Sequence, residues 1–422
     1  MTKKQIFALA AFVYLFLAPF TFHPDIKTIF YQSQFLSQGI FNASTSLSIK
    51  PELVERFNIY SFFAANPDKA FLGNFVYPPL AYFLFGIFFI PVKLLAGTGF
   101  VEWLGMGNDS VVVPHIFQYL FVIKLPAIIA HFTTGYFIFK LLQGVSLQNQ
   151  NKALALWFFN PISLYTVGFM GQIDSIAVLL TVLALFLAKK KSIYATVLLG
   201  LGAAFKTYPL LILPFLAIYS GKTWSKKLLS FVLGFGTYLL FILPFITTPA
   251  FYSSTFVSGL SQRLFELKLY VGFGENILIV PAILIVLFLF AVSKKLENIS
   301  QLSNFFLATL FIVVALVHFH PQWALWFLPF LVILVINKTK DSSVWVALAL
   351  LFLGWLGTVL LFDDKFLSWG ILAPIDPGIL FLPTLSELLH RFFDPLLAQS
   401  IFHTLMLASG VYLVSKSFKE NE

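Results

Sequence analysis

The sequence predicts an all-α polytopic membrane protein, and three observations support this. Hydrophobic residues occupy 59% of the 422 positions and charged residues 11%. The mean hydropathy is +0.90, and long apolar runs recur at the length of bilayer-spanning helices, about 20 residues each. Because a soluble domain carries about 25% charged residues, we expect a single integral membrane domain over residues 1–422. We expect this domain to be a bundle of about 10–13 transmembrane helices.

The basic residues gather between the apolar runs, although the formal net charge is +9. Such clusters mark cytoplasmic turns, so the charge is a topology signal and no nucleic-acid partner is expected. By this rule both termini are cytoplasmic, and the polar segments between the clusters lie on the exoplasmic face. The clusters are at Lys152, 189–191, Lys226 and Lys227, Lys294 and Lys295, and Lys338 and Lys340.

The first elements follow from this rule. Residues 5–22 form a retained first helix, because Lys3 and Lys4 precede it and no small-residue cleavage site follows. Residues 23–74 form an exoplasmic loop with short juxtamembrane helices. A module over 75–220 and C-terminal helices over 221–422 complete the chain.

The number of crossings between residues 74 and 152 must be odd, yet two apolar runs are present, 77–95 and 111–142. Either the first run returns to its own side, or the second is broken near Lys124 and Pro126, where proline removes a helix hydrogen bond. The sequence leaves both alternatives open.

The run over 193–220 is interrupted by Lys206 and Pro209, which leave two halves that are too short to cross a core of ~30 Å. Broken helices at membrane depth line cavities. Ionisable residues in such surroundings are candidates for function, which selects Lys206 and also Asp174. Snorkelling of the Lys206 ammonium to the interface is the alternative.

Six segments appear in a fixed order: HPDIKTIFYQSQFLSQGIF at 23–41, FVYPPLAYFLFG at 75–86, KLPAIIAHFTTGYFIFKLL at 124–142, FFNPISLYTVGFMGQIDS at 158–175, AAFKTYPLLILPF at 203–215 and HPQWALWFLPF at 320–330. Together they resemble the landmarks of GT-C-fold glycosyltransferases. The nearest likeness is to the GPI mannosyltransferase I catalytic subunit and to bacterial polyprenol-phosphate mannosyltransferases. The resemblance covers the first half of the chain and reaches the last third through HPQW.

This resemblance implies transfer of a sugar, with mannose favoured, from a polyprenyl-phosphate-sugar donor to a lipid or glycan acceptor. It implies an exoplasmic active site, inversion at the anomeric carbon, and a carboxylate of the first outer loop as the base. We expect a monomer surrounded by membrane lipids, in a bacterial or archaeal plasma membrane.

Asp25 follows the first helix and is the candidate base, a role that contributes typically ~10²–10⁴ in rate. The alternative is that it caps the segment beginning at Ile26. Members of the GPI enzyme family have a second acid two residues later, where this chain has Lys27. One carboxylate supplies too few oxygen ligands for a divalent cation, so no metal or other cofactor is expected. Lys27 becomes a candidate to attract a phosphate.

The leaving lipid phosphate requires cations or strong hydrogen-bond donors close to its oxygens. Arg263 has a local alternative, a surface ion pair with Glu266 at helical spacing. For the histidines the alternative is packing beside tryptophans, and activity should vary near a pKa of about 6.5 if a neutral His320 contributes. The candidates in outer segments are Lys206, Arg263, His318 and His320.

Gln172 and Asp174 open a helix in the sequence GQIDS. An acid in a first turn serves the helix dipole or a cap. The alternative is that this pair binds a sugar or positions Lys206. The remaining candidates for substrate positioning are Tyr77, Tyr208 and Gln322, whereas His131 is expected to be a buried structural histidine.

Two further classes of function remain open. A transporter or flippase of lipid-linked sugars also places polar residues at broken helices, but such proteins have internal repeats, and none is evident. In a noncatalytic partner of glycan assembly, Asp25 would be dispensable. The chain has no cysteine, which excludes disulfides and thiolate chemistry, and GFGEN at 272–276 is too weak a motif to indicate a nucleotide.

Overall fold

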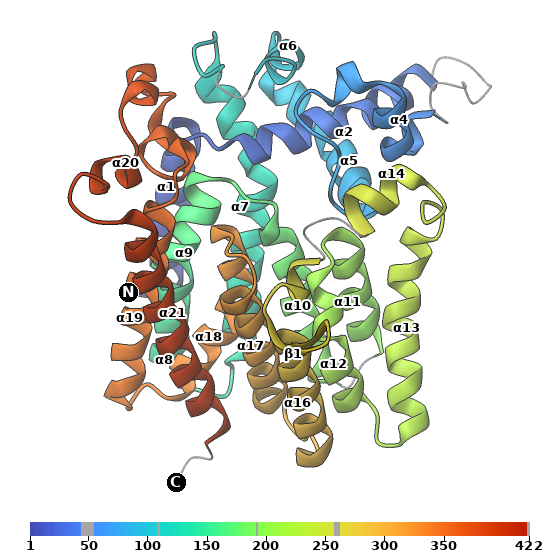
Figure 1. The fold of residues 1–422 in the computed structure, drawn as a ribbon, viewed down its shortest axis with the longest axis vertical. Coiled ribbons are helices and arrows are strands. Elements are labelled where there is room, and N and C mark those ends of the chain that lie inside the picture. Colours follow the sequence, from blue (N-terminus) through green and yellow to red (C-terminus); the bar gives the residue numbers. More distant parts are fainter. Residues whose placement is uncertain (44–54, 108–109, 191–192, 257–261, 420–422) are drawn as a thin grey trace.

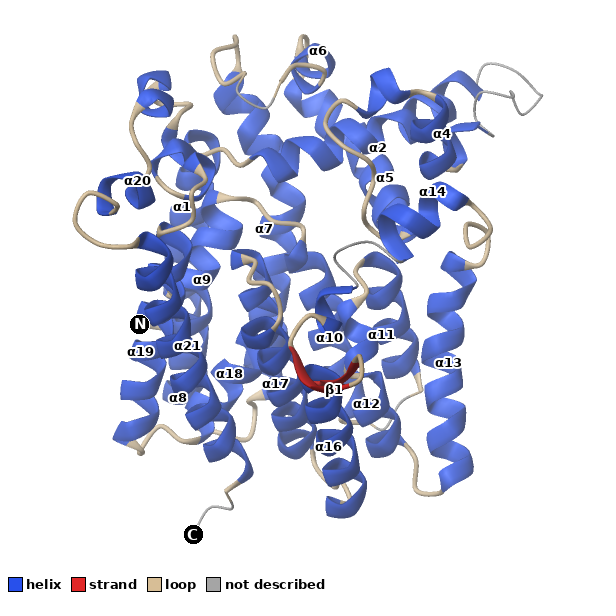
Figure 2. Ribbon diagram, viewed as in Figure 1, coloured by secondary structure: helices blue, strands red, loops and turns tan. Residues whose placement is uncertain are grey.

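The computed structural model describes residues 1–43, 55–107, 110–190, 193–256 and 262–419. Helices dominate it, and a two-stranded hairpin is the one sheet among these residues (Figures 1 and 2). In the same residues, seven helices are long and apolar enough to cross a membrane, and four shorter apolar helices accompany them. The protein is therefore an all-α polytopic membrane protein, as the sequence predicts.

The elements of the first half are α1 (Lys3–Leu17), α2 (Pro24–Ala43), α4 (Ile59–Ala65), α5 (Pro79–Ala96), α6 (Phe100–Leu104), α7 (Ile116–Leu141), α8 (Leu147–Phe159), α9 (Pro161–Ser163), α10 (Asp174–Ala188), α11 (Tyr194–Phe205) and α12 (Leu213–Ser220). Those of the second half are α13 (Trp224–Ile242), α14 (Pro249–Phe251), β1 (Lys268–Gly272), β2 (Glu275–Leu278), α16 (Ile279–Lys294), α17 (Ile299–Leu316), α18 (Ala324–Asn337), α19 (Ser342–Leu360), α20 (Leu385–Leu389) and α21 (Pro395–Phe418).

A layer of helices covers one end of the bundle, at the top of Figure 1. Within it, α2 runs across the bundle, and α4 and α6 lie nearby. Ile26, Ile29 and Phe30 of α2 are buried, at the spacing of an amphipathic helix. The sequence predicts only short helices over 23–74, whereas α2 alone has 20 residues. Residues 44–54 of this predicted loop lie outside the described residues.

The position of α5 bears on the two alternatives for residues 74–152. Figure 1 shows α5 in the upper layer with α2, and α6 and the start of α7 at the same end. Gln118 of α7 donates a hydrogen bond to the Leu95 carbonyl at 2.8 Å, which ties the end of α5 to the start of α7. Helix α7 continues through Pro126 as one helix, so the break proposed near Lys124 and Pro126 is absent. Helix α5 is itself long and apolar enough to cross a membrane, and its return to its own side stays a prediction.

The predicted break near Lys206 is present. Helix α11 ends at Phe205, and Lys206 has extended backbone angles of φ −151 and ψ 126. A 3-10 turn that contains Pro209 then leads to α12. Because α11 packs along α10, this break places Lys206 beside the first residue of α10.

The hairpin of β1 and β2 was not predicted from the sequence. Its strands are antiparallel, with Lys268 opposite Leu278. Phe273 at its tip has a positive φ of 49 and stands between two glycines that also have positive φ. The hairpin lies in front of the bundle, coloured red in Figure 2, and leads directly into α16.

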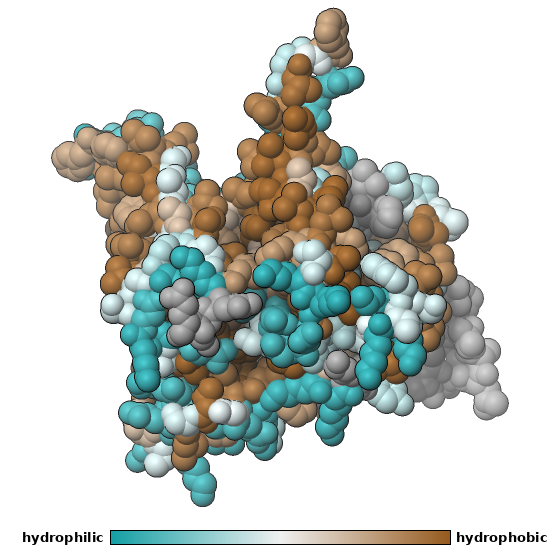
Figure 3. All heavy atoms as spheres, turned by 90° about the horizontal axis from the view of Figure 1, so that it is seen from below, coloured by the Kyte–Doolittle hydropathy of each residue, from teal (hydrophilic) through white to brown (hydrophobic). Residues whose placement is uncertain are grey.

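Two contacts join segments that the positive-inside rule places on one side. Asn151 donates to the Met1 carbonyl at 3.2 Å, and Lys338 donates to the Lys419 carbonyl at 3.2 Å. Seen from below in Figure 3, hydrophilic residues cluster across this end of the bundle, and hydrophobic surface covers two projecting parts. Lys191 of the predicted clusters lies outside the described residues.

Candidate active site

Asp25 lies in the first turn of α2. Pro24 occupies the first helical position, which suits a residue without an N–H. The backbone N–H of Asp25 donates to Nδ1 of His23 at 3.3 Å, so the His23 ring satisfies this free group at the helix start. The Asp25 side chain is 40% exposed, and its carboxylate is available for other contacts.

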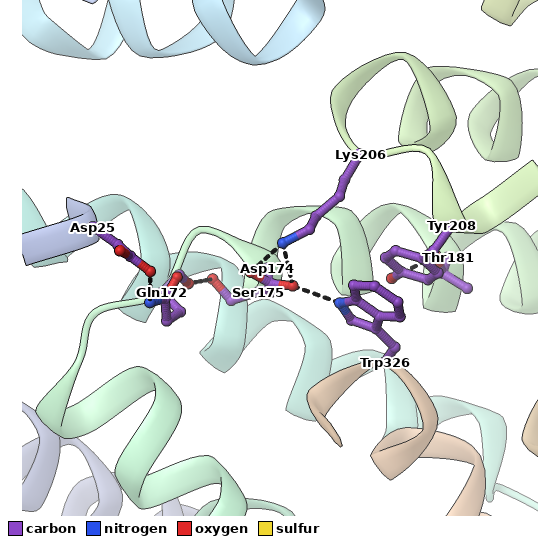
Figure 4. A network of polar contacts seen from close by, with 8 residues as sticks. All are labelled: Asp25, Gln172, Asp174, Ser175, Thr181, Lys206, Tyr208 and Trp326. Atoms are coloured by element: carbon purple, nitrogen blue, oxygen red, sulfur yellow. Dashed lines mark hydrogen bonds and ion pairs between the residues drawn. The ribbon is translucent and has the colours of Figure 1, made fainter. Parts of the chain in front are cut away.

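Gln172 fixes one side of the Asp25 carboxylate. Its Nε2 donates to Oδ2 of Asp25 at 2.7 Å, across 147 residues of sequence (Figure 4). Gln172 itself is 1% exposed. Among the hydrogen bonds of the described residues, none reaches the second oxygen, Oδ1. The carboxylate is therefore oriented through one oxygen and open at the other.

The backbone before Gln172 has an unusual local structure. A π-helix spans Leu164–Phe169, and the Gln172 N–H then donates to the Thr166 carbonyl at 2.9 Å. Gly171 has φ +72, and a Cβ there would lie 2.5 Å from Cγ of Lys124. A side chain at position 171 would therefore collide with Lys124, and only glycine adopts this φ without strain.

Lys124 of α7 holds the two segments that carry Asp25 and Gln172. Its Nζ donates to the Thr21 carbonyl, the Thr21 hydroxyl and the Phe169 carbonyl, each at 2.6 Å. All three of its N–H groups have a partner, and the side chain is fully buried. Sequence reasoning considered Lys124 only as a helix break. Its charge within an apolar run was the signal that could have identified it.

Asp174 and Lys206 form a buried ion pair. Nζ of Lys206 lies 2.7 Å from each carboxylate oxygen of Asp174, and the side chains are 12% exposed for Lys206 and 0% for Asp174. Trp326 of α18 also donates its indole N–H to Asp174. No acid is near Lys206 in the sequence, but the fold brings Asp174 to it. This contact agrees with the alternative in which Asp174 positions Lys206.

Aromatic rings surround this ion pair. The Lys206 ammonium lies 5.5 Å from the centroids of both Tyr77 and Trp326, within range of cation–π attraction. Tyr208 stacks on Trp326 at 4.2 Å between centroids and an angle of 8°. The Tyr208 hydroxyl lies 3.3 Å from the Thr181 hydroxyl. Tyr77 therefore lies next to the ion pair. Tyr208 lies against the Trp326 ring (Figure 4).

Tyr77 connects the ion pair to Asp25 electrostatically. Burial raises the pKa of Tyr77, and the negative charges of Asp25 and Asp174 raise it further. Both carboxylates are therefore close enough to act on one phenol. The Tyr77 hydroxyl stays protonated at neutral pH and is a hydrogen-bond donor as well as an acceptor.

Arg263 and His320 are in direct contact, with Nη1 of Arg263 on Nε2 of His320. Burial lowers the pKa of His320 to about 3, and the charges of Arg263, His318 and Lys206 contribute, while Asp25 opposes. His320 is therefore within electrostatic reach of Asp25 and Lys206. Burial and then Arg263 also lower the pKa of His318, whose ring is 5.0 Å from that of His320.

The contact with Arg263 assigns the tautomer of His320. A guanidinium only donates hydrogen bonds, so Nε2 of His320 accepts and the proton of the neutral ring is on Nδ1. His320 therefore offers one N–H donor and no charge at neutral pH. Its lowered pKa of about 3 lies below the value of about 6.5 expected from the sequence, and the dependence of activity on pH stays a prediction.

The surroundings of Lys27 and Gln322 differ from those expected of a phosphate or substrate site, and Arg263 lies beside His320. Lys27 is fully buried, and its Nζ donates to the carbonyls of Met106 and Gly107 at 3.0 and 2.7 Å. Gln322 is also buried, and its side chain makes none of the hydrogen bonds found among the described residues. Arg263 contacts His320, and an ion pair with Glu266 is not among those of the described chain. Because the Lys27 ammonium is buried against two backbone carbonyls, we leave it out of the phosphate site. The role of Gln322 in positioning the substrate stays a prediction.

His131 is buried, as the structural interpretation expects. Its Nε2 lies 3.0 Å from the Tyr14 hydroxyl, and its ring stacks on Trp157 at 4.5 Å. In the ranges that the structure describes, no group of three or more His, Cys, Asp or Glu residues is arranged to hold a metal ion. Independence from metal stays a prediction.

No family model matches the chain. A curated protein of Debaryomyces hansenii, GPI mannosyltransferase 1, is 36% identical over 100 residues. The match covers 22% of this chain and 24% of that protein, so it spans about a quarter of the relative's length. This similarity supports a glycosyltransferase-like function in an integral, multi-pass membrane protein.

Proposed function

We propose that this protein transfers mannose from a polyprenyl-phosphate-mannose donor to a lipid or glycan acceptor, with inversion and with Asp25 as the general base. The partial similarity to a mannosyltransferase supports the sugar and the reaction class. We further propose that the end of the bundle that carries α2 faces the exoplasm, because the cationic turns gather on the other side.

The environment of Asp25 is the observation that carries this proposal. Asp25 is held by Gln172 through Oδ2, its Oδ1 is open, and the residue lines a cavity of about 290 Å³. A general base must be within hydrogen-bond reach of the hydroxyl that it deprotonates. A half-exposed, oriented carboxylate at a cavity meets this requirement.

The cationic side of the site suits the leaving group. Lys206 uses two of its three N–H groups on Asp174, which leaves one for a phosphate oxygen. Arg263 adds a charge, and His320 adds a neutral Nδ1–H. Charge-assisted hydrogen bonds of this kind strengthen as the leaving oxygen gains charge.

In the proposed step, the acceptor oxygen attacks the anomeric carbon as its proton passes to Oδ1 of Asp25. The bond from the anomeric carbon to the phosphate oxygen breaks, and polyprenyl phosphate leaves with the electron pair towards Lys206 and Arg263. Tyr77 lies between the two sides and is placed to donate a hydrogen bond to the sugar.

The test is transfer of label from radiolabelled polyprenyl-phosphate mannose by purified protein in nanodiscs, with membrane lipid extract as the acceptor source. Asp25→Asn should reduce turnover by ~10² or more. Asp68→Asn is the matched control, because Asp68 is an acid of the same predicted outer region whose side chain is 70% exposed. Turnover of Asp25→Asn within about tenfold of the unaltered protein would remove Asp25 as the base.

A further inference from the structure

The cavity beside Asp25 lies between α2 and the segment that precedes α5. Its volume is about 290 Å³, close to the lower end of small-molecule pockets, about 300–1,000 Å³. The polar lining residues are Asp25, Thr28, Gln32, Asn74 and Tyr77, and the remaining ones are Ile29, Leu72, Gly73 and Val76.

Charge divides the site into two parts. Asp25 is the one charged residue among the described residues that line the cavity. The cations Lys206 and Arg263 are not in this lining, although Lys206 lies 5.5 Å from the Tyr77 ring. A phosphate bound in the cavity would meet a carboxylate and no cation, which is unfavourable.

The hydroxyl and amide groups that line the cavity suit a polar ligand without a phosphate. Gln32 is buried and donates one amide N–H to the Gly73 carbonyl at 2.9 Å. This contact holds the segment after residue 72 against α2. It leaves the second amide N–H and the amide oxygen of Gln32 for a ligand. Thr28 and Asn74 add a hydroxyl and a second amide, and Tyr77 adds an aromatic face.

We infer that this cavity is the acceptor subsite and that it binds one uncharged sugar ring of the acceptor. The inference rests on the proposed function. In an inverting transfer the base and the leaving phosphate are on opposite faces of the anomeric carbon. Because the cavity contains the base and none of the cations, it is on the acceptor side. Any phosphate of the acceptor must lie outside it.

The first experiment measures binding without donor. Saturation-transfer NMR on protein in nanodiscs uses methyl α-D-mannoside and methyl β-D-glucoside as neutral probes, and mannose 6-phosphate as the anionic probe. A neutral glycoside should receive saturation, and Thr28→Val and Asn74→Leu should each weaken its binding about 2- to 13-fold, the range for one lost hydrogen bond. Binding of mannose 6-phosphate should be insensitive to both substitutions.

The second experiment measures transfer from polyprenyl-phosphate mannose. Both variants should raise the acceptor KM and leave the donor KM unchanged. The matched control is Thr404→Val, because the Thr404 hydroxyl only bonds within α21, to the Ser400 carbonyl.

The outcomes separate the two proposals. A rise in donor KM with an unchanged acceptor KM would mean that the cavity holds the donor sugar, and the inference would be wrong while the transferase stands. The inference also fails if no neutral glycoside binds, or if mannose 6-phosphate binds in a manner sensitive to Thr28→Val. Binding of a neutral glycoside that depends on Thr28, without transfer from any polyprenyl-phosphate sugar, would retain the subsite and reject the proposed function.

Discussion

Replacing Lys206 alone should lower the free energy of unfolding, because it leaves the buried Asp174 carboxylate without its cation. The Asp174 side chain is 0% exposed and receives both of its ion-pair contacts from Lys206 at 2.7 Å. In Lys206→Met the carboxylate would retain the Trp326 N–H but no cation. Breaking a buried pair by removing one partner costs about 3–5 kcal/mol, and we expect a loss of this size in the free energy of unfolding.

The double variant Asp174→Asn with Lys206→Met removes both charges. Replacing a buried ion pair by neutral groups is often close to neutral, and the amide oxygen introduced at position 174 could still accept from Trp326. We expect the double variant to recover at least about 2 kcal/mol relative to Lys206→Met. The control is Lys416→Met, which breaks a more exposed pair with Asp341 (2.8 Å; 23% and 31% exposed) and should destabilise the protein much less than Lys206→Met, because solvent screens exposed charges.

Reversible unfolding by SDS titration, followed by tryptophan fluorescence, measures these differences. The reasoning is wrong if Lys206→Met costs no more than Lys416→Met, or if the double variant is no more stable than the single one. The folded double variant also isolates function. If Lys206 contacts the donor phosphate, the double variant should have a raised KM for the donor. If the Lys206 ammonium only snorkels to the interface, the KM for the donor should be unchanged.

The same contacts lead to three further predictions. Lys124→Met leaves the buried Thr21 carbonyl without its donor, at about 1–3 kcal/mol, whereas the Phe169 carbonyl still accepts from the Thr21 hydroxyl at 3.0 Å. The substitution should lower turnover by displacing Asp25 from Gln172, and turnover equal to that of the unaltered protein would contradict this positioning role. The unfolded chain binds a proton at His320 below about pH 6.5, whereas the native state does so only near its lowered pKa of about 3. The free energy of unfolding should therefore fall as the pH decreases through this window, and His320→Gln should flatten the slope between about pH 6.5 and 5 in urea or SDS titrations; an identical slope would refute the assignment. Chelation by EDTA should leave turnover intact, and activity that is lost and then restored by Mg²⁺ or Mn²⁺ would require a second acid beside Asp25.

The sequence by itself determined the class of the protein and several positions in it. Apolar runs and basic turns predict the polytopic bundle, because hydropathy and chain length act locally along each helix. The break at Lys206 and Pro209 was predictable because proline and a charge interrupt any apolar helix. Asp174, at the start of α10, was a candidate because it is ionisable within an apolar run. Asp25, at the start of α2, was a candidate because it follows the first helix and because the family resemblance implies a carboxylate there.

Tertiary structure alone decided which of these residues meet. Gln172 reaches Asp25 across 147 residues, Lys124 reaches Thr21 across 103, and Arg263 reaches His320 across 57. Periodicity reports the buried face of a helix but not the neighbour that covers it. The same limit applies to Lys27, which the sequence places near Asp25 but which the fold turns towards the carbonyls of Met106 and Gly107. Partners of buried charges depend on helix packing, which brings distant segments within hydrogen-bond distance.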